Sequence, residues 1–194
     1  TAASHGRVFI VEVMGHKVGW LTLYAGIAGG ADIILIPEIP YDIKAIIEAL
    51  QKRQRAGSRF SIIVVAEGAI SKETAALSKK ERKTKLASRR YPSVAYEIGA
   101  EIQAITGQEV RVTVPGHTQR GGAPNPYDRV LSSRLGARAA KLISEGRFGE
   151  MVVIRNNEIT SIPLEESAGK LKTVDPNSSI VEEARLLGLS FGDR

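Results

Sequence analysis

The amino-acid sequence contains five short, mostly apolar runs rich in β-branched residues, and helical patterns separate them. These runs cover residues 8–13, 33–36, 61–66, 110–114 and 151–154. The helical patterns lie near residues 18–28, 42–55, 93–105, 127–145 and 178–187. Continuously apolar strands are buried on both faces, and helices that alternate with strands form βαβ units with parallel pairing. We therefore predict an α/β fold in which helices cover both faces of a mostly parallel sheet.

The composition excludes several classes of protein. A chain of 194 residues with 43% hydrophobic and 25% charged residues is typical of a globular domain. No apolar run approaches the roughly 20 residues of a membrane-spanning helix, so we expect no membrane partner. Because there is no cysteine, disulfide scaffolds, thiol nucleophiles and cysteine-ligated metals are excluded. The N-terminal residues lack the pattern of a secretory signal, which favours a cytoplasmic location.

The net charge of +6 is concentrated in residues 71–90, which hold eight basic and two acidic residues. The rest of the chain has 19 of each sign. We interpret this stretch as a solvated insertion, and an anion or effector site is the alternative. Nucleic-acid binding usually needs charge spread over a folded face with recognition motifs or aromatic residues beside it. We therefore expect no nucleic-acid partner.

Three loops that follow predicted strands carry the candidate functional residues. In an open parallel sheet, ligands bind outside the carboxyl ends of the strands. The first loop has glycines that let the backbone approach a ligand, the second begins with a carboxylate, and the third combines histidine, arginine and three glycines. Their candidate residues are Met14, Gly15, His16 and Lys17 in the first loop, Glu67 in the second, and His117 and Arg120 in the third.

Together these residue types favour a sugar-phosphate site. Arginine and histidine donate charged hydrogen bonds to phosphate, and glutamate accepts hydrogen bonds from hydroxyl groups. Each element also has a structural interpretation. Gly15 and Gly19 could serve strand-to-helix packing, Glu67 could be a helix N-cap or a surface acid, and His117 could form a structural pair with Arg120.

Arg7 and Arg111 do not fit that crevice, because they lie near the starts of predicted strands. Both belong to the opposite end of the sheet. They are either solvated charges at the strand ends or groups that serve the ligand of a neighbouring subunit.

Several strings of residues resemble the 6-phosphofructokinase family, in order and over nearly the whole chain. They are SHGR at 4–7, VEVMG at 11–15, AGGAD at 28–32, IPE at 36–38, GHTQRGG at 116–122 and YDR at 127–129. The basic insertion at 71–90 resembles that of a longer subgroup of the family, in which pyrophosphate use is one alternative.

The resemblance implies the C-terminal, sugar-phosphate-binding part of an enzyme of glycolysis that transfers a phosphoryl group to the 1-hydroxyl of fructose 6-phosphate. The implied fold is the three-layer αβα sandwich of the phosphofructokinase C-terminal domain. We expect a fructose-6-phosphate-binding domain at 1–172, with the insertion at 71–90, and a C-terminal helical segment at 173–194. A homo-oligomer is also expected.

The resemblance also implies roles for one histidine and three arginines. His117 and Arg120 would bind the 6-phosphate of the sugar. Arg7 and Arg111 would reach the 6-phosphate across a subunit interface, which would explain their place at the other end of the sheet.

In the first two loops, the resemblance implies that Met14, Gly15 and Glu67 hold the sugar. The family usually has arginine after Met-Gly, where it stabilises charge on the transferring phosphoryl group. This chain has His16 followed by Lys17. These two residues are the candidates for transition-state contacts, His16 is also expected at the substrate, and no catalytic residue is assigned with certainty.

Two family strings are absent from the sequence: the Gly-Gly-Asp-Gly loop of the phosphate-donor site and the Thr-Ile-Asp-Asn-Asp string that carries the catalytic base. The chain starts at Thr1 and runs almost at once into a strand, as a piece of a longer chain would. We expect it to be inactive alone, because phosphoryl transfer needs donor, metal and acceptor in line. Mg²⁺ with ATP or pyrophosphate would act in the intact enzyme, with none bound to this piece. The alternative is a non-catalytic sugar-phosphate-binding or regulatory module.

Overall fold

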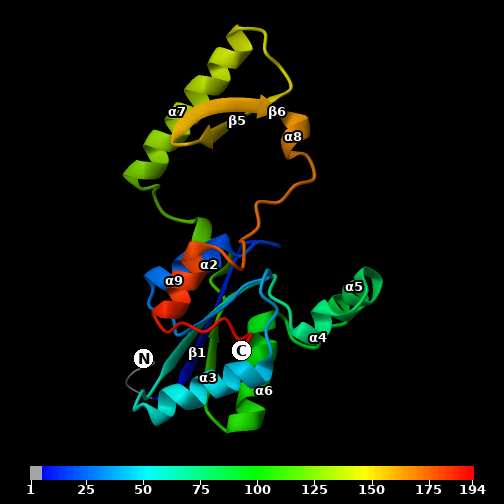
Figure 1. The fold of residues 1–194 in the computed structure, drawn as a ribbon, viewed down its shortest axis with the longest axis vertical. Helices are drawn as coiled ribbons and strands as arrows, with labels where there is room; N and C mark the ends of the chain where they lie inside the picture. Colours follow the sequence, from blue (N-terminus) through cyan, green and yellow to red (C-terminus); the bar gives the residue numbers. More distant parts are fainter. Residues whose placement is uncertain (1–5) are drawn as a thin grey trace. The chain divides into compact units, whose positions relative to one another are not determined.

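The computed structural model describes residues 6–194, which form two compact units (Figure 1). Unit 1 comprises the described residues up to Gln119 together with Lys172–Arg194. Unit 2 comprises Arg120–Leu171. The last residues of the chain thus belong to unit 1, whereas the expected division placed a boundary at residue 172. Within residues 6–194, no helix has both the length and the apolar character needed to cross a bilayer.

Unit 1 is built on a four-stranded sheet in the order β2-β3-β1-β4, and every neighbouring pair is parallel. The strands are β1 at Val8–Val13, β2 at Ile33–Leu35, β3 at Ser61–Ala66 and β4 at Val110–Thr113. All four coincide with apolar runs in the sequence. The prediction of a parallel sheet is confirmed for these strands.

Helices cover both faces of this sheet, as the alternating direction of strand side chains requires. The helices are α2 at Trp20–Ala28, α3 at Ile43–Arg55, α6 at Val94–Thr106 and α9 at Ser179–Leu186. On one face, Ile33 and Leu35 pack in a cluster with residues of α3 and α6. On the other face, Ile34 packs with residues of α2 and α9, which lie side by side in Figure 1. The predicted three-layer α/β sandwich is confirmed.

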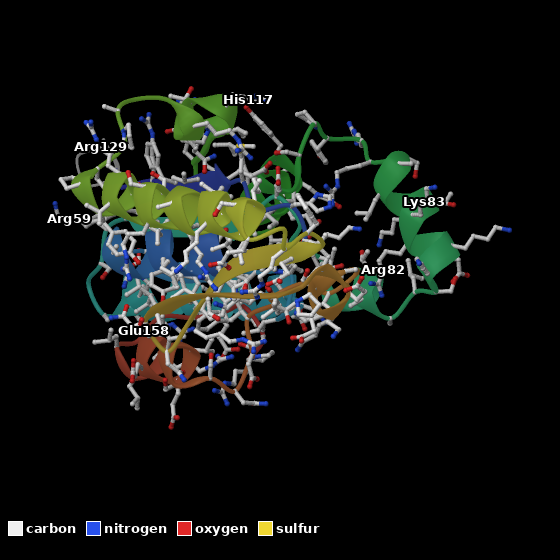
Figure 2. All side chains as sticks on the ribbon, turned by 90° about the horizontal axis from the view of Figure 1, so that it is seen from above. Arg59, Arg82, Lys83, His117, Arg129 and Glu158 are labelled. Carbon is white, nitrogen blue, oxygen red and sulfur yellow. The ribbon has the colours of Figure 1, made fainter. Side chains whose placement is uncertain are left out.

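The basic stretch forms two short helices, α4 at Lys72–Ala75 and α5 at Lys79–Ala87, which project from the sheet (Figures 1 and 2). Ser78 and Glu81 form a reciprocal capping box at the start of α5. The Arg82 guanidinium donates to the Ala75 carbonyl oxygen at 2.6 Å, which ties α5 to α4. No side chain of α5 is buried.

Unit 2 contains α7 at Pro126–Ser144, β5 at Glu150–Arg155, β6 at Glu158–Pro163 and α8 at Leu164–Ser167. β5 pairs with β6 in an antiparallel hairpin. The interpretation of the 151–154 run as a further strand of the parallel sheet is therefore wrong. Asn156 and Asn157 both have positive φ, at 50° and 65°, which is the backbone of a tight hairpin turn.

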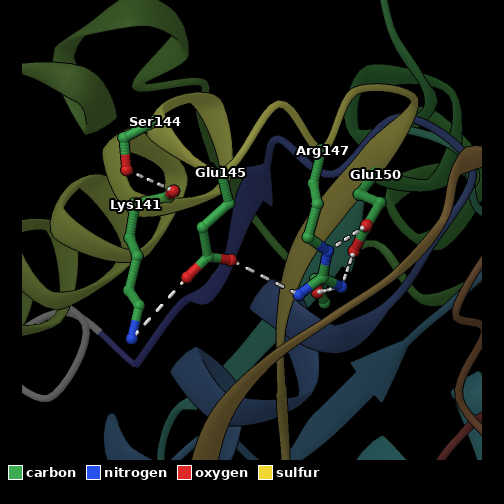
Figure 3. Close-up of polar contacts among 6 residues, drawn as sticks. Lys141, Ser144, Glu145, Arg147 and Glu150 are labelled. Atoms are coloured by element: carbon green, nitrogen blue, oxygen red, sulfur yellow. Dashed lines mark hydrogen bonds and ion pairs between the residues drawn. The ribbon is translucent and has the colours of Figure 1, made fainter.

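An ion-pair network joins the end of α7 to β5 within unit 2 (Figure 3). The Arg147 guanidinium donates two hydrogen bonds of 2.7 Å to the Glu150 carboxylate. These bonds lower the pKa of Glu150 below its usual range. Glu145 lies between Lys141 at 3.8 Å and Arg147 at 3.7 Å. Because Lys141, Glu145 and Arg147 are exposed and only Glu150 is partly buried, the network orients the connection more than it stabilises the unit.

The C-terminal segment is integrated in unit 1 through Phe191, whose side chain is fully buried. The Arg185 guanidinium lies 4.7 Å from the centre of the Phe191 ring and donates two hydrogen bonds to the Asp193 carboxylate. Ser190 forms a parallel bridge with Ile33 at the edge of the sheet. The last residues therefore complete the core rather than trail from it.

Replacing Phe191 with alanine should lower the free energy of unfolding of unit 1 by about 3–5 kcal/mol, because the substitution leaves a cavity in a packed core. The matched control is Leu186→Ala on α9, since the Leu186 side chain is 80% exposed and should change stability by less than about 0.5 kcal/mol. Denaturant unfolding followed by fluorescence of Trp20, the single tryptophan, measures both. Equal effects of the two substitutions would contradict the integration of this segment.

Candidate functional site

The order of the strands brings three loops together at the carboxyl edge of the sheet in unit 1. Because β1 lies between β3 and β4 and all three strands are parallel, the loops that follow them are neighbours. Two side chains bridge these loops. Glu67 links the loop after β3 to the loop after β1, and Gln119 links the loop after β4 to the same central loop.

The Glu67 carboxylate binds the backbone of the central loop. Its Oε1 atom accepts hydrogen bonds from the Gly15 N–H at 3.1 Å and the His16 N–H at 2.6 Å. The Glu67 N–H donates to the Val13 carbonyl oxygen at 3.0 Å, which fixes the start of its loop. Its side chain is otherwise exposed. Glu67 therefore neither caps a helix nor stands isolated on the surface.

The central loop has a tight turn that presents these two N–H groups. The Val18 N–H donates to the Gly15 carbonyl oxygen at 3.1 Å, and His16 inside the turn has a φ of +57°. Such a left-handed value is unusual for a residue with a side chain. A Cβ atom on Gly68 would lie 2.1 Å from the His16 carbonyl oxygen, so only glycine permits this approach of the two loops.

The loop after β4 forms the short 3₁₀ helix η1 at Gly116–Arg120. The Met14 N–H donates to Oε1 of Gln119 at 3.3 Å, and the His117 side chain is exposed on the same element (Figure 2). Gln119 was not among the predicted site residues. Gln119 lies in the GHTQRGG string, from which only the histidine, the arginine and the glycines were used to predict the site.

Arg120 ends η1 and is the first residue of unit 2. Its side chain is exposed. Of the two residues expected to hold a phosphate, His117 thus belongs with the loops of unit 1. Lys17, next to His16, is also exposed beside those loops.

The two arginines assigned to the other end of the sheet lie there. Arg7 directly precedes β1, and Arg111 pairs in register with Phe9 near the start of that strand. Both guanidinium groups form ion pairs with the Glu109 carboxylate. The shared carboxylate therefore holds two cationic side chains together at this edge. The Arg7 side chain is partly buried, and that of Arg111 is exposed.

Glu38 is a second residue that sequence reasoning missed. Its Oε1 atom accepts hydrogen bonds from the Gly19 N–H at 3.0 Å and the Val174 N–H at 2.9 Å. Its Oε2 atom is buried and has no hydrogen-bond partner among residues 6–194. Because Gly19 directly precedes α2, Glu38 fixes the end of the central loop.

The described part of the chain contains no group of three or more histidine, aspartate or glutamate side chains that could hold a metal ion. The site therefore consists of backbone N–H groups, one carboxylate, one amide and exposed cationic or titratable side chains. Such a set can bind oxygen-rich ligands that carry a negative charge.

The comparisons with known proteins identify the family of the chain. A family model described as phosphofructokinase matches residues 1–143. The ATP-dependent 6-phosphofructokinases of Spirochaeta thermophila and Chloroflexus aurantiacus are 55% and 48% identical to this chain over 193 of its 194 residues. These alignments cover 53% and 52% of the two relatives, so the chain spans about half the length of the curated relatives it matches.

Solved structures give the same result. Phosphofructokinase from Saccharomyces cerevisiae aligns with a TM-score of 0.65 and 36% identity, over 86% of this chain and 21% of that chain. A pyrophosphate-dependent phosphofructokinase from Nitrosospira multiformis aligns with a TM-score of 0.73 over 92% of this chain and 46% of that chain, and its 19% identity supports the fold alone. The chain belongs to the phosphofructokinase family.

Gly68→Ala should reduce the free energy of unfolding by about 1–3 kcal/mol, because the added Cβ overlaps the His16 carbonyl and forces the loops apart. Gly136→Ala in α7 is the control, since a Cβ there meets no atom within 4 Å. The control should be neutral or stabilising by up to about 1 kcal/mol, because alanine favours the helix. Denaturant unfolding followed by circular dichroism measures both, and a neutral Gly68→Ala would contradict the close approach of the loops.

Proposed function

We propose that this chain supplies the fructose 6-phosphate-binding part of a 6-phosphofructokinase, an enzyme that transfers a phosphoryl group to the 1-hydroxyl of the sugar in glycolysis. The observation that carries the proposal is the convergence of the three loops through Glu67 and Gln119, with His117 beside them. Membership of the family and the printed names of the relatives support the choice of substrate.

The proposed roles follow from the chemistry of each side chain. His117 and Arg120 donate to the 6-phosphate, and Glu67 accepts from hydroxyl groups of the sugar beside Met14 and Gly15. In a homo-oligomer, Arg7 and Arg111 of one subunit act on the phosphate bound by its neighbour. Their grouping on one carboxylate at the opposite edge of the sheet supports a shared role for the two arginines.

His16 and Lys17 are the proposed contacts with the transferring phosphoryl group. Both side chains are exposed beside Glu67, and the His16 backbone is held by the carboxylate. In general, an imidazole is charged only in part near neutral pH, whereas a lysine side chain carries a compact ammonium group on a long, flexible stem. We therefore assign the larger share of charge stabilisation to Lys17.

The proposed catalytic apparatus includes parts that this sequence does not contain. The donor loop and the catalytic-base string of the family are absent, and residues 6–194 offer no set of side chains for a metal. Mg²⁺ bound with the donor would neutralise the charge of the phosphoryl group. This chain would bind and orient the acceptor sugar in the cytoplasm. ATP is the donor that the names of the curated relatives favour, and pyrophosphate is the donor named for the Nitrosospira multiformis structure.

A non-catalytic sugar-phosphate-binding module is the second candidate function, and the absence of the two strings favours it. To distinguish the two candidates, this chain is mixed with a separate chain made from the part of a relative that carries those strings, and turnover is measured. Restored turnover supports the enzyme.

Calorimetry with fructose 6-phosphate tests the binding role of the chain. The wild type should bind, and both His117→Ala and Arg120→Ala should weaken binding at least about tenfold, because each removes a charge-assisted hydrogen bond to phosphate. Lys83→Ala on α5 is the control for loss of one positive charge, and its affinity should equal that of the wild type (Figure 2). Equal losses in all three variants would indicate a general electrostatic effect and contradict the assigned site.

The chain alone should show no fructose 6-phosphate-dependent consumption of ATP or pyrophosphate above the rate without protein. The reason is that in-line transfer needs a positioned donor and base. A coupled assay with each donor, with fructose 6-phosphate at a concentration that saturates the protein, measures this consumption. Turnover within about tenfold of the 1–100 s⁻¹ typical of kinases would overturn the proposed division of roles.

A further inference from the structure

We propose that the Gly15 and His16 N–H groups form an anion site that the Glu67 carboxylate occupies in the empty protein, and that a phosphate-type anion displaces Glu67 from it. The proposal deepens the proposed function and rests on it only for the identity of the natural ligand. Its central observation is that two successive N–H groups converge on a single carboxylate oxygen.

The geometry of the pair is that of a backbone anion site. Successive N–H groups converge when neighbouring residues adopt φ values of opposite sign, and the resulting concavity binds anions. Gly15 has a negative or extended φ and His16 has a φ of +57°. The bond from the His16 N–H, at 2.6 Å, is the shorter of the two, and hydrogen bonds from backbone N–H groups to carboxylates are shorter and stronger than those between neutral groups.

The site is preorganised by contacts that do not involve the Glu67 side chain. The Gly15-to-Val18 turn closes through a backbone hydrogen bond of 3.1 Å. Gln119 holds the Met14 N–H, and the close approach of Gly68 supports the His16 carbonyl from the other side. The two N–H groups would therefore keep their direction when the carboxylate leaves.

Departure of Glu67 is feasible because its side chain is exposed, while its backbone stays fixed through the hydrogen bond to Val13. The surroundings favour an incoming anion, since His16 and Lys17 are exposed on the loop after β1 and His117 is exposed on the loop after β4. The displaced carboxylate would then be free to accept hydrogen bonds from hydroxyl groups. Binding of an anion and binding of a hydroxylated ligand would thus support each other.

The chemistry of the site selects a tetrahedral oxyanion, which presents several acceptor oxygens to converging N–H groups. Such a group could come from a sugar phosphate or from a phosphoryl donor. Inorganic phosphate is the probe for the shared chemistry, and fructose 6-phosphate and pyrophosphate are the probes for the two sources.

The experiment is a titration with inorganic phosphate, followed by the amide NMR signals of Gly15 and His16. Glu67→Ala should bind phosphate about tenfold more tightly than the wild type, because it removes a charge-assisted competitor from the N–H groups. Glu67→Gln should lie between the two, since the amide oxygen still accepts from the N–H groups without a charge. Glu48→Gln, an exposed carboxylate on α3, controls for net charge and should match the wild type.

The order of affinities decides the proposal. Equal gains in Glu67→Ala and Glu67→Gln would show that only the charge matters and would overturn it, as would phosphate shifts confined to other residues. If Glu67→Ala does not fold, Glu67→Gln is compared with Glu48→Gln: a gain in phosphate affinity in Glu67→Gln alone supports the proposal, and equal affinities of the two variants overturn it.

The remaining arms separate the ligands. A tighter response of Gly15 and His16 to fructose 6-phosphate or to pyrophosphate than to inorganic phosphate supports the proposal and identifies the source of the anion. Failure of fructose 6-phosphate to bind the wild type, with the phosphate series intact, would overturn the proposed substrate and leave the anion site supported.

Discussion

The burial of β1 between β3 and β4 is the constraint on which the rest of unit 1 depends. Parallel pairing in this order aligns the carboxyl ends of three strands, so loops from residues 14, 67 and 116 onward become neighbours. β1 also carries a buried carboxylate, Glu12, which accepts a hydrogen bond from the Ala95 N–H at the start of α6. The strand therefore positions both the edge that carries the candidate site and the start of α6. The hydrogen bond also gives the buried Glu12 carboxylate a partner, and burial without one would be costly.

Strands β1, β2 and β3 could be predicted from the sequence because their burial leaves a nearly continuous apolar run. The edge strand β4 instead alternates half-buried valines with exposed Arg111 and Thr113, and its β-branched residues indicated a strand. The run at 151–154 has the same signature, yet its partner is the less apolar β6 at Glu158–Pro163. What decides the pairing is the turn at Asn156 and Asn157, whose positive φ values reverse the chain within two residues. Local composition predicts a strand, but the partner depends on turn geometry that the apolar pattern does not encode.

The candidate site could be predicted to the level of loops. The rule that ligands bind at the carboxyl ends of parallel strands is sufficient to select Glu67, the Gly15 loop and the His117 loop. Glu38 and Gln119 escaped because their partners are backbone N–H groups of residues 19 and 105 positions away. Such side-chain-to-backbone bonds leave no periodicity or spacing in a sequence. They become visible only when the loops are placed side by side.

The net charge and the candidate site are physically separate. The surplus of positive charge lies on residues 71–90, where α5 buries no side chain and most of the cations are exposed. The site instead directs backbone N–H groups and a few side chains to one point. Fixed dipoles act strongly on an anion because they need no reorganisation when it arrives, whereas mobile surface lysines are screened by water and salt. In the proposed anion site, recognition would therefore depend on how rigidly the Gly15 turn is held, and the Glu67 carboxylate is the group that the anion would displace.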